Sequence, residues 1–344
     1  MIVLSNCLTQ TADEGCLKVA VSLVKRLKQK DPHTVVVGYE RESPFCDQFL
    51  TLNKWMLSRS LWRILRQKKQ PVLFAPFSAK LRSTALRALM ISLFARGQVL
   101  LLQPMYSEMD FMAKFLLKLS GAKVLCLSQC TYEDYRSHLG NKAVYVQTGV
   151  DTKRFTPGSD KQELRKKYNL PVDKPIVLHV GHLKEGRNIA QFQKLSPAFH
   201  GLVVVSTHTP DEQSETLRQM LNRQENVTLL EGYQPNIEEL YRLSDVYLFP
   251  VAEKKSCIDV PLSALEAAAC GIPVVTTPFR EMQNLIGKEG FYEIGSFEPE
   301  NLNALLQKAA DEKKNPREAV LPYDWDRAIE TLTFSGSGKE GYFD

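Results

Sequence analysis

Two basic side chains follow a glycine at the end of an apolar run, a spacing suited to binding phosphate. The segment GHLKEGRN, residues 181–188, comes directly after the apolar run IVLHV. A glycine loop between a strand and a helix presents backbone N–H groups at the carboxyl edge of a sheet. Arg187 adds a fork of donors with a permanent charge, and His182 adds a neutral or protonated donor. The segment predicts a diphosphate site around Gly181. A solvent loop with incidental basic residues is the alternative, and this loop alone does not decide between them.

A carboxylate in an apolar helix is the second candidate for chemistry. The stretch CIDVPLSALEAAACGIPVV, residues 257–275, reads as a loop, a helix and a buried strand. Pro261 suits the first helical turn, because its fixed φ fits there and its missing N–H is not needed. The free N–H groups of Leu262 and Ser263 predict a second binding site for phosphate. Glu266 lies among small apolar side chains, where a charged group requires a partner or a function.

Strands and helices alternate along the chain around these two segments. Short apolar runs predict strands over residues 2–5, 34–39, 72–75, 99–102, 123–127, 143–147, 176–180, 202–206, 227–230, 246–249 and 274–276. Apolar residues spaced three and four apart predict helices over residues 16–30, 54–68, 111–119, 188–195, 211–223, 236–243, 262–270 and 299–310. Such alternation favours parallel sheets covered by helices on both faces.

The alternation is interrupted between residues 148 and 159, where glycine, proline and charged residues cluster. We therefore predict an α/β protein of two Rossmann-like, doubly wound domains, with a boundary at residues 150 and 151. Open α/β sheets bind ligands at the carboxyl ends of their strands, so two facing sheets define a central cleft. Residues 334–344 are rich in glycine and serine, and we expect them to fray.

Composition excludes several classes of protein. The chain has 344 residues, of which 44% are hydrophobic, which is enough for two cores. It contains no apolar run of membrane-spanning length, and its start lacks the pattern of a signal peptide. Seven cysteines without C-x-x-C pairs indicate reduced thiols in a cytoplasmic protein rather than a zinc or disulfide site.

Positive charge gathers in the N-terminal half. Residues 1–150 carry 21 Lys and Arg against 10 Asp and Glu, and no acidic residue lies between Asp47 and Glu108. Within this region, the predicted helix 54–68 interleaves Trp55 and Trp62 with basic residues. Such a helix fits an anionic membrane face, which predicts a peripheral membrane protein. A domain helix with its apolar side in the core is an equal alternative. We expect no nucleic-acid partner.

The order of the segments resembles the retaining GT-B glycosyltransferases that carry an E-x7-E signature, a family that includes bacterial mannosyltransferases and sucrose synthases. Four stretches are similar to the family's motifs, in the family's order. They are QTGVDTKRFTPG, VLHVGHLKEGRNI, LLEGYQPNIEELYRLSDVYLFPV and CIDVPLSALEAAACGIPVV. The resemblance covers roughly residues 145–290 and is weak in the N-terminal half.

The resemblance implies a role for each candidate residue toward a nucleotide-sugar donor. Glu266 matches the second glutamate, which binds the ribose hydroxyls; a carboxylate paired with a neighbouring Lys or Arg is the alternative. Leu262 and Ser263 take the diphosphate on their N–H groups, and Arg187 and His182 replace the family's lysine and arginine. The remaining donor contacts implied are Gly15, Gly181, Tyr233, Gln234 and Pro261.

Three departures from the family pattern stand out. Ile258 occupies the position of the first glutamate, and an isoleucine cannot bind a sugar hydroxyl. We favour Asp259 as a displaced sugar contact over a solvent-facing loop aspartate. His182 replaces an arginine, which places more of the leaving-group stabilisation on Arg187. The family's N-domain histidine is replaced by Gln103 and Tyr106, which become weak candidates for the acceptor side.

The resemblance also implies how the chain is divided. Residues 1–150 would form the acceptor domain and residues 151–325 the nucleotide-sugar domain. Residues 326–344 would form a helix returning toward the N-terminal domain, followed by the tail. Asp324, Trp325 and Asp326 have a D-x-D spacing; we expect a helix start with Asp324 as its cap and Trp325 packed between domains, and no metal site.

The expected activity is that of a hexosyltransferase that acts with retention, in bacterial surface polysaccharide or glycolipid assembly. The donor would be linked to UDP or GDP, and the acceptor would be a glycan or a lipid-linked glycan. We expect neither a metal nor another cofactor. The alternative is a catalytically degenerate GT-B protein that binds its partners in a polysaccharide complex, which the missing first glutamate motivates. A second alternative, an epimerase of the same fold, would need paired carboxylates and histidines that the sequence does not place.

Overall fold

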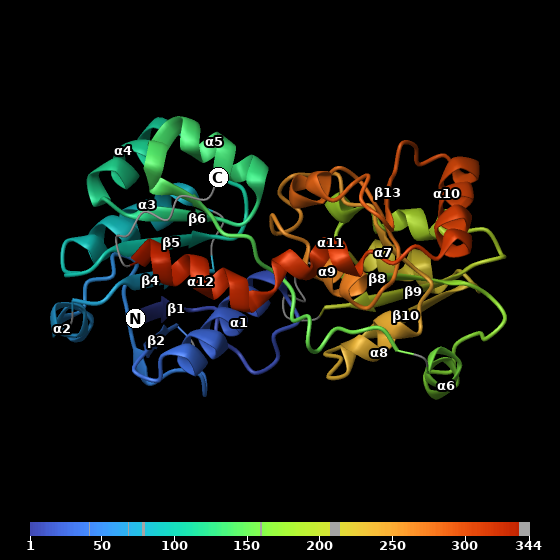
Figure 1. The fold of residues 1–344 in the computed structure, drawn as a ribbon, viewed down its shortest axis with the longest axis horizontal. Coiled ribbons are helices and arrows are strands. Elements are labelled where there is room, and N and C mark those ends of the chain that lie inside the picture. Colours follow the sequence, from blue (N-terminus) through green and yellow to red (C-terminus); the bar gives the residue numbers. More distant parts are fainter. Residues whose placement is uncertain (41, 68, 78–79, 159, 207–213, 337–344) are drawn as a thin grey trace. The chain divides into compact units, whose positions relative to one another are not determined.

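The protein is described by a computed structural model, which divides the chain into two compact α/β units (Figure 1). It describes residues 1–336 except 41, 68, 78–79, 159 and 207–213. The first unit contains residues 1–148 together with the chain from Trp325 onward, and the second contains Gly149–Asp324. Each unit is built around one parallel sheet.

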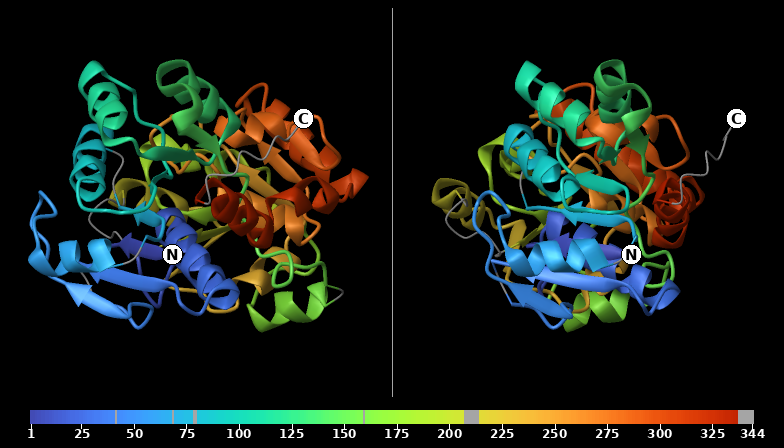
Figure 2. Two further views of the ribbon diagram at one scale, coloured as in Figure 1. Left: turned by 60° about the vertical axis from the view of Figure 1, so that its left-hand side comes forward. Right: turned by 90° about the vertical axis from the view of Figure 1, so that its left-hand side faces the viewer.

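The first sheet has seven parallel strands in the order β3-β2-β1-β4-β5-β6-β7. The strands are β1 (Ile2–Ser5), β2 (Val35–Tyr39), β3 (Gln48–Leu50), β4 (Val72–Ala75), β5 (Val99–Gln103), β6 (Lys123–Cys126) and β7 (Ala143–Tyr145). The helices are α1 (Gly15–Lys30), α2 (Arg59–Gln67), α3 (Leu81–Ser92), α4 (Phe111–Ser120), α5 (Gln129–Leu139), the short η1 (Gly140–Lys142) and α12 (Trp325–Gly336). Helices lie on both faces of this sheet, as Figure 2 shows.

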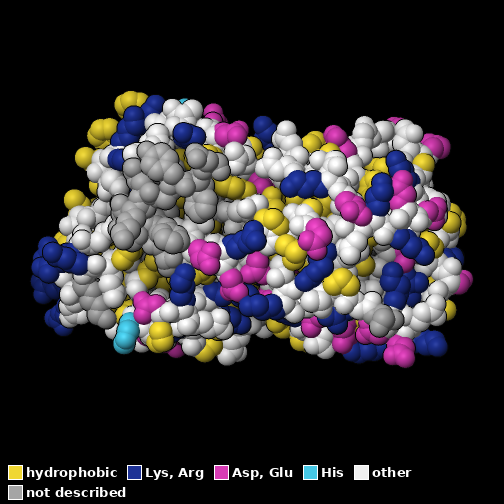
Figure 3. Space-filling view, viewed as in Figure 1, with side chains coloured by type: hydrophobic (Ala, Val, Ile, Leu, Met, Phe, Trp, Pro, Cys, Tyr) yellow, Lys and Arg dark blue, Asp and Glu magenta, His cyan; other side chains and the backbone are white. Residues whose placement is uncertain are grey.

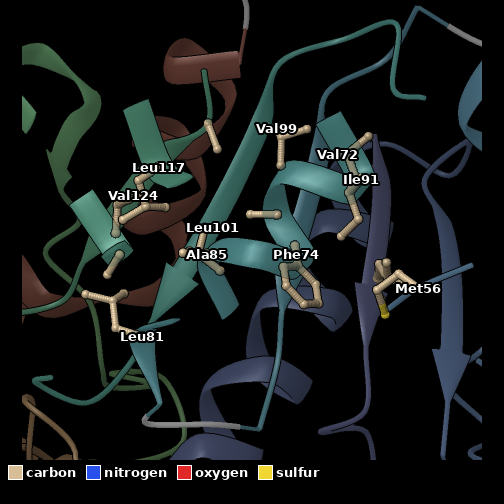
Figure 4. Close-up of a cluster of buried hydrophobic side chains, with 14 of the residues drawn as sticks. Met56, Val72, Phe74, Leu81, Ala85, Ile91, Val99, Leu101, Leu117 and Val124 are labelled. Atoms are coloured by element: carbon tan, nitrogen blue, oxygen red, sulfur yellow. The ribbon is translucent and has the colours of Figure 1, made fainter. Parts of the chain in front are cut away.

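The core of the first unit is a continuous apolar cluster between the sheet and its helices (Figure 4). Val72 and Phe74 of β4 lie beside Leu101 of β5, and Ala85 of α3 and Leu117 of α4 close the cluster. The burial of these apolar side chains supplies most of the driving force for folding of the first unit. It also fixes which faces of α3 and α4 point outward.

The second sheet has six parallel strands in the order β10-β9-β8-β11-β12-β13. The strands are β8 (Ile176–Gly181), β9 (His200–Val205), β10 (Val227–Glu231), β11 (Val246–Phe249), β12 (Val274–Thr276) and β13 (Phe291–Glu293). The α-helices are α6 (Lys161–Lys167), α7 (Glu215–Asn222), α8 (Ile237–Arg242), α9 (Leu262–Ala269), α10 (Pro299–Glu312) and α11 (Arg317–Val320). Short 3₁₀ turns are η2 (Glu185–Arg187), η3 (Ile189–Lys194), η5 (Arg280–Asn284) and η6 (Leu321–Tyr323).

In each sheet, the order in which the chain adds strands reverses at one point. In the first, β1 lies between β2 and β4, and in the second, β8 lies between β9 and β11. This doubly wound order confirms the predicted fold class, and it creates a crevice at the carboxyl ends of the strands where the order reverses. The two candidate segments of the sequence follow β8 and β11, the pair at the reversal of the second sheet.

Several predicted elements are wrong in extent or type. The helix predicted over 54–68 begins only at Arg59, because Asn53 accepts hydrogen bonds from the N–H groups of Trp55 and Leu57 in a turn. The segment predicted as a helix over 188–195 is the 3₁₀ turn η3. Helix α7 begins at Glu215, and the part predicted before Ser214 lies outside the described residues.

Strands β3 and β13 and helices α3, α5, α6, α11 and α12 were not predicted with bounds from the apolar pattern. Their apolar faces are narrow or interrupted by polar residues, so the period is weak over a single element. Helices α3 and α5 connect consecutive strands of the first sheet, whereas α11 and α12 follow the last strand.

Helix α12 belongs to the first unit, where it lies beside α1 (Figure 1). Asp326 accepts from Arg26 Nε at 3.2 Å, and Trp325, Ile329 and Leu332 are buried. Asp324, which precedes the helix, accepts from the N–H and hydroxyl of Thr152, at 3.1 and 2.5 Å. The two aspartates of the D-x-D spacing therefore bind partners in different units. Among the residues that the structure describes, no helix is long and apolar enough to cross a bilayer.

Candidate functional site

The loops after β8 and β11 carry the candidate site. Strand β8 ends at Gly181 and leads into His182 and the η2 turn, which ends at Arg187. Strand β11 ends at Phe249, and the loop that follows leads to α9. Both strands run parallel at the reversal of the sheet, so their loops emerge at the same edge.

Gly181 makes room for the Arg187 guanidinium. A Cβ atom at Gly181 would lie 2.3 Å from Arg187 Nη1, which is closer than any real contact. Arg187 Nε donates to the Ser256 carbonyl at 3.0 Å, which ties the η2 turn to the loop before α9. Among the described residues, Ser256 is the one hydrogen-bond acceptor of this side chain, so both Nη groups are available to an anion. The glycine therefore serves side-chain packing as well as the loop.

His182 is enclosed beside the same loop. Its side chain is buried, and Nε2 lies 3.4 Å from the Ser206 hydroxyl. Ser206 in turn donates its N–H to the Gly181 carbonyl, which holds the ends of β8 and β9 together. His182 is therefore held in place at the end of β8 rather than lying free at the surface.

Helix α9 begins at Leu262. Pro261, which was predicted to lie in the first helical turn, is the N-cap that precedes it. The Pro261 carbonyl accepts from the N–H groups of Ala264 and Leu265 at 3.0 and 3.3 Å. Within the described chain, the N–H groups of Leu262 and Ser263 have no such acceptor, so they remain available to an anion at the positive end of the helix.

The start of α9 is fixed by the sheet below it. The Tyr247 hydroxyl, from β11, donates to Ser263 Oγ at 2.7 Å. Tyr247 is fully buried, so this bond holds the first turn of α9 over the end of β11. The sequence identified Ser263 but not Tyr247, since an aromatic residue within a predicted strand gives no sign of such a contact.

Glu266 is buried one turn further along α9, where the Tyr241 hydroxyl donates to Glu266 Oε2 at 2.7 Å. Burial and the neighbouring carboxylate raise the pKa of the Tyr241 phenol well above its ordinary value, so it stays a donor. One hydrogen-bond partner of Glu266 is thus a neutral hydroxyl. Arg154, whose guanidinium pairs with Glu238 at 2.7 Å, is also within electrostatic reach of Glu266.

A buried histidine lies behind the Arg187 loop. His179 is fully buried in β8, with its ring parallel to those of Tyr247 and Phe249. Nδ1 lies 2.9 Å from the Leu248 carbonyl, which only accepts, so Nδ1 carries the proton and Nε2 the lone pair. No described residue partners Nε2, which lies next to Gly181 on the side that Arg187 Nη1 also approaches. Burial lowers the pKa of His179 to about 3, so the ring is neutral near pH 7.

The loop that departs from the resemblance is closed in the structure. Asp259 is fully buried and Ile258 nearly so. The Asp259 carbonyl accepts from the N–H of Glu281 at 3.3 Å. Asp259 is therefore not the solvent-facing loop aspartate of the alternative, because the carboxylate lies inside the unit. Ile258 packs as an apolar residue.

Tyr233 and Gln234 follow β10, one strand beyond β9. The Tyr233 ring is 43% exposed, and Gln234 Nε2 donates to the Gly232 carbonyl at 3.3 Å. Gly232 has a φ of +95°, which turns the chain sharply after the strand. The two residues are thus presented at the same edge as His182, since β8, β9 and β10 are parallel.

Three predicted residues belong to the first unit. Gly15 is the first residue of α1, after the extended Glu14. Gln103 ends β5, fully buried, and its Nε2 donates to the Met105 carbonyl at 2.7 Å while no described residue partners Oε1. Tyr106 lies on the loop that follows, with its ring centroid 6.4 Å from that of Tyr135.

Donors for an anion and a buried carboxylate are thus joined at one edge of the second sheet. Arg187, the α9 N-terminus and His182 can bind phosphate oxygens, and Glu266 can accept from hydroxyl groups. In the part of the chain that the structure describes, no cluster of three or more His, Cys, Asp and Glu side chains could hold a metal ion. The arrangement suits a ligand that combines a diphosphate with a diol.

Comparison with known proteins agrees with this chemistry. Residues 174–311, which lie entirely within the second unit, match the family described as glycosyl transferases group 1. The matched range includes the Arg187 loop and helix α9.

Two curated bacterial proteins are similar to part of this chain. A protein named for teichuronic acid biosynthesis, TuaC of Bacillus subtilis, is 23% identical over 188 residues, which are 54% of this chain and 46% of TuaC. A GDP-mannose-dependent phosphatidylinositol monomannoside mannosyltransferase of Corynebacterium glutamicum is 29% identical over 168 residues, which are 43% of this chain and 42% of that enzyme. The chain thus spans less than half the length of these relatives.

The similarity of fold extends over both units. The crystal structure of HepE from Anabaena, in complex with UDP and glucose, has a TM-score of 0.76 and 14% identity, and the match covers 98% of this chain and 99% of HepE. At this identity, the match shows the fold alone, which is the GT-B pairing of two Rossmann-like domains.

Proposed function

We propose that this protein transfers a hexosyl unit from a nucleotide-sugar to a glycan or glycolipid acceptor, with retention of configuration, in bacterial surface polysaccharide or glycolipid assembly. The observation that carries the proposal is the joint placement of Arg187, the α9 N-terminus and Glu266 at the reversal of the second sheet. The group 1 match over residues 174–311 supports it. HepE was crystallised with UDP-glucose and the corynebacterial relative is named for GDP-mannose, so both UDP and GDP are candidate bases.

In this proposal, the donor diphosphate binds between the Arg187 guanidinium and the N–H groups of Leu262 and Ser263. Glu266 accepts hydrogen bonds from the ribose hydroxyls. As the bond from the anomeric carbon to the phosphate oxygen breaks, negative charge grows on the leaving diphosphate, and these donors stabilise it. His182 adds a hydrogen-bond donor on the same side.

The anomeric carbon then develops oxocarbenium character. The acceptor hydroxyl attacks it from the face that the diphosphate leaves, and the hydroxyl proton passes to the leaving phosphate oxygen. The products are the glycosylated acceptor, with the original anomeric configuration, and a nucleoside diphosphate. Among the described residues, the site offers no cluster for a resident metal, so we assign this stabilisation to side-chain and backbone donors.

We place the protein in the cytoplasm. Its seven cysteines are free thiols in the structure, and five of them are buried. Peripheral membrane association, with a lipid-linked acceptor, is part of the same proposal.

Calorimetric titration with UDP and GDP tests the donor site. Glu266→Gln keeps an oxygen acceptor for the Tyr241 hydroxyl but removes the charge, so the fold should survive. A charged carboxylate hydrogen-bonded to a diol contributes roughly 1.5–3 kcal/mol, so we expect affinity to fall about tenfold or more. Glu293→Gln, on an exposed position of β13, is the matched control. Unchanged affinity in Glu266→Gln would show that the ribose contact is assigned wrongly.

A turnover assay distinguishes the proposed enzyme from a catalytically degenerate binding protein. The comparisons do not favour the degenerate protein. Purified protein would be screened with UDP- and GDP-sugars and glycan or lipid-linked acceptors, with release of nucleoside diphosphate as the signal. Proton NMR of the product would give the anomeric configuration. Binding of a nucleotide with no release on any donor would favour the degenerate protein, and an inverted product would refute retention.

A further inference from the structure

Helix α4 carries a stripe of large apolar side chains on the outside of the first unit. We call these four residues the α4 stripe. They are Phe111, Met112, Phe115 and Leu119, with exposed fractions of 81%, 50%, 52% and 61%. They fall on one side of the helix, because residues spaced by three, four and eight positions share a face. Ala113 and Leu117 are fully buried on the opposite side. The α4 stripe is therefore not part of the apolar core of the first unit.

Helix α2, the sequence's candidate for a membrane contact, does not have this property. Leu61 and Leu65 are buried in the core, and Ile64 packs against it. Trp62 stacks on Phe94 with ring centroids 4.0 Å apart. The apolar side of α2 thus belongs to the core, as the alternative predicted, and α2 leaves no comparable stripe for a bilayer.

The surroundings of the α4 stripe are basic. No acidic residue lies between Asp110 and Glu133, and α4 itself carries Lys114 and Lys118. Helix α3, which packs against α4, also lacks acidic residues, whereas α5, which packs against α4 as well, carries Glu133 and Asp134 together with Arg136. Asp110 accepts a hydrogen bond from Arg82 Nε of α3, so the nearest carboxylate is neutralised. Figure 3 shows hydrophobic and Lys or Arg side chains together over the position of α4.

We propose that the α4 stripe docks this protein onto an anionic lipid bilayer. The helix would lie in the plane of the interface, with the aromatic rings among the acyl chains and Lys114 and Lys118 at the head groups. A large exposed apolar patch favours an interaction site, and the Lys and Arg residues of α3 and α4 favour a negatively charged partner. A symmetric contact between two copies fits less well, because it would bring these lysines against their own counterparts.

Vesicle sedimentation tests the proposal on the full chain. We would use phosphatidylcholine vesicles with and without phosphatidylglycerol, at low and high salt. We expect binding to the anionic vesicles at low salt. The double variant Phe111→Ser, Phe115→Ser should lower the partition coefficient at least ~tenfold, because two rings no longer leave water. The double variant Lys114→Gln, Lys118→Gln should weaken binding and reduce its dependence on salt.

A matched control uses two other exposed apolar residues of the first unit. Trp55 and Leu57 are each 44% exposed, and the variant Trp55→Ser, Leu57→Ser should bind like the wild type. In addition, Phe115→Trp should show a blue-shifted emission that brominated lipid quenches. Circular dichroism confirms folding, and Met112→Gln with Leu119→Gln replaces the phenylalanine pair if that pair unfolds.

Three outcomes would overturn the proposal. They are no binding to anionic vesicles at low salt, equal binding by the α4 variants, and equal loss in the Trp55 and Leu57 control. Wild-type self-association that the phenylalanine variant abolishes, without vesicle binding, would assign the stripe to a second copy instead. Nucleotide affinity measured on the same samples keeps this test separate, because the proposed donor site lies in the second unit.

Discussion

Gly181 and Arg187 are coupled through space as well as by their loop. The absence of a side chain at Gly181 lets the guanidinium lie against the end of β8. The family resemblance indicated both residues as donor contacts but not that one makes room for the other. The physical reason is close packing, since a methyl group and a guanidinium nitrogen cannot occupy the same space.

Gly181→Ala should therefore weaken nucleotide binding without unfolding the protein. The added methyl group would push Arg187 Nη1 away from its place, 2.3 Å from the new atom. The guanidinium is the end of a flexible side chain, so we expect a small change in stability and a several-fold loss of UDP or GDP affinity by calorimetry. Gly295→Ala is the control, because an added Cβ meets nothing there within 4 Å. Equal affinity in the two variants would contradict the coupling.

His179 predicts how stability depends on pH. Burial lowers the pKa of this ring from 6.5 to about 3 in the folded state, so the unfolded state binds the proton first. The contribution of His179 to the free energy of unfolding is therefore complete above pH ~6.5. It is lost as the pH falls toward ~3, by up to ~1.4 kcal/mol per pH unit. His179→Phe keeps the stacked ring but cannot titrate. We expect its melting temperature to fall less steeply between pH 7 and pH 4.5 than that of the wild type.

The exposed His33 provides the comparison for this effect. His33→Phe should retain the wild-type slope of melting temperature against pH. A wild-type slope in His179→Phe would show that other groups dominate the acid sensitivity of the protein.

Among the elements, α9 depends on the segment that leads into the second unit. A Cβ atom at Gly149, whose φ is +151°, would lie 2.8 Å from Leu265 Cδ1 and 3.0 Å from Leu262 Cδ2. Both leucines belong to α9, the helix that carries the N–H groups and the carboxylate of the candidate site. The predicted boundary segment thus packs directly under the site.

Gly149→Ala should destabilise the protein by roughly 1–3 kcal/mol, through overpacking against α9 and an unfavourable backbone. Gly140→Ala separates the two effects, because Gly140 has a φ of +61° but nothing within 4 Å of an added Cβ. Urea unfolding measures both variants. If Gly140→Ala costs as much, backbone strain rather than contact with α9 explains the loss.

Elements were predicted well where an apolar period is long and its ends are marked. Helix α4 ends at Gly121, with a φ of +66°, and α9 ends before Gly271, with a φ of +80°. Both stops are visible in the sequence, because glycine alone adopts this conformation without strain. Residues 54–58 were misassigned because leucine and tryptophan at helical spacing also occur in a turn held by Asn53.

At the scale of the whole molecule, the chain leaves its first unit and returns to it. The structure assigns the chain from Trp325 onward to the first unit, although the whole second unit separates it from residue 148. The apolar pattern of α12 gives no local signal of this return, which the sequence predicted only through the family resemblance. Its destination depends on which buried surface it completes.

Ile329→Ala should destabilise the first unit selectively. Ile329 is 2% exposed, and removing a buried isoleucine side chain down to alanine costs about 2–5 kcal/mol. Hydrogen exchange followed by mass spectrometry should show faster exchange in α1, which lies against α12, and little change in β8. Thr331→Ala, at a partly exposed position of the same helix, should have little effect. Equal acceleration in both units would show that they unfold together.

The sequence by itself indicated the alternation of strands and helices and the two segments that carry the candidate site, and it predicted a boundary at residues 150 and 151. These features are local, because period, glycine stops and motif order are readable along the chain. Only the tertiary structure decided that Tyr241 meets Glu266, that Asp259 is buried, that α2 belongs to the core and that α4 is exposed. Each of these depends on which faces meet across the sheets, and a helix pattern does not state which apolar residues exceed what its core can bury.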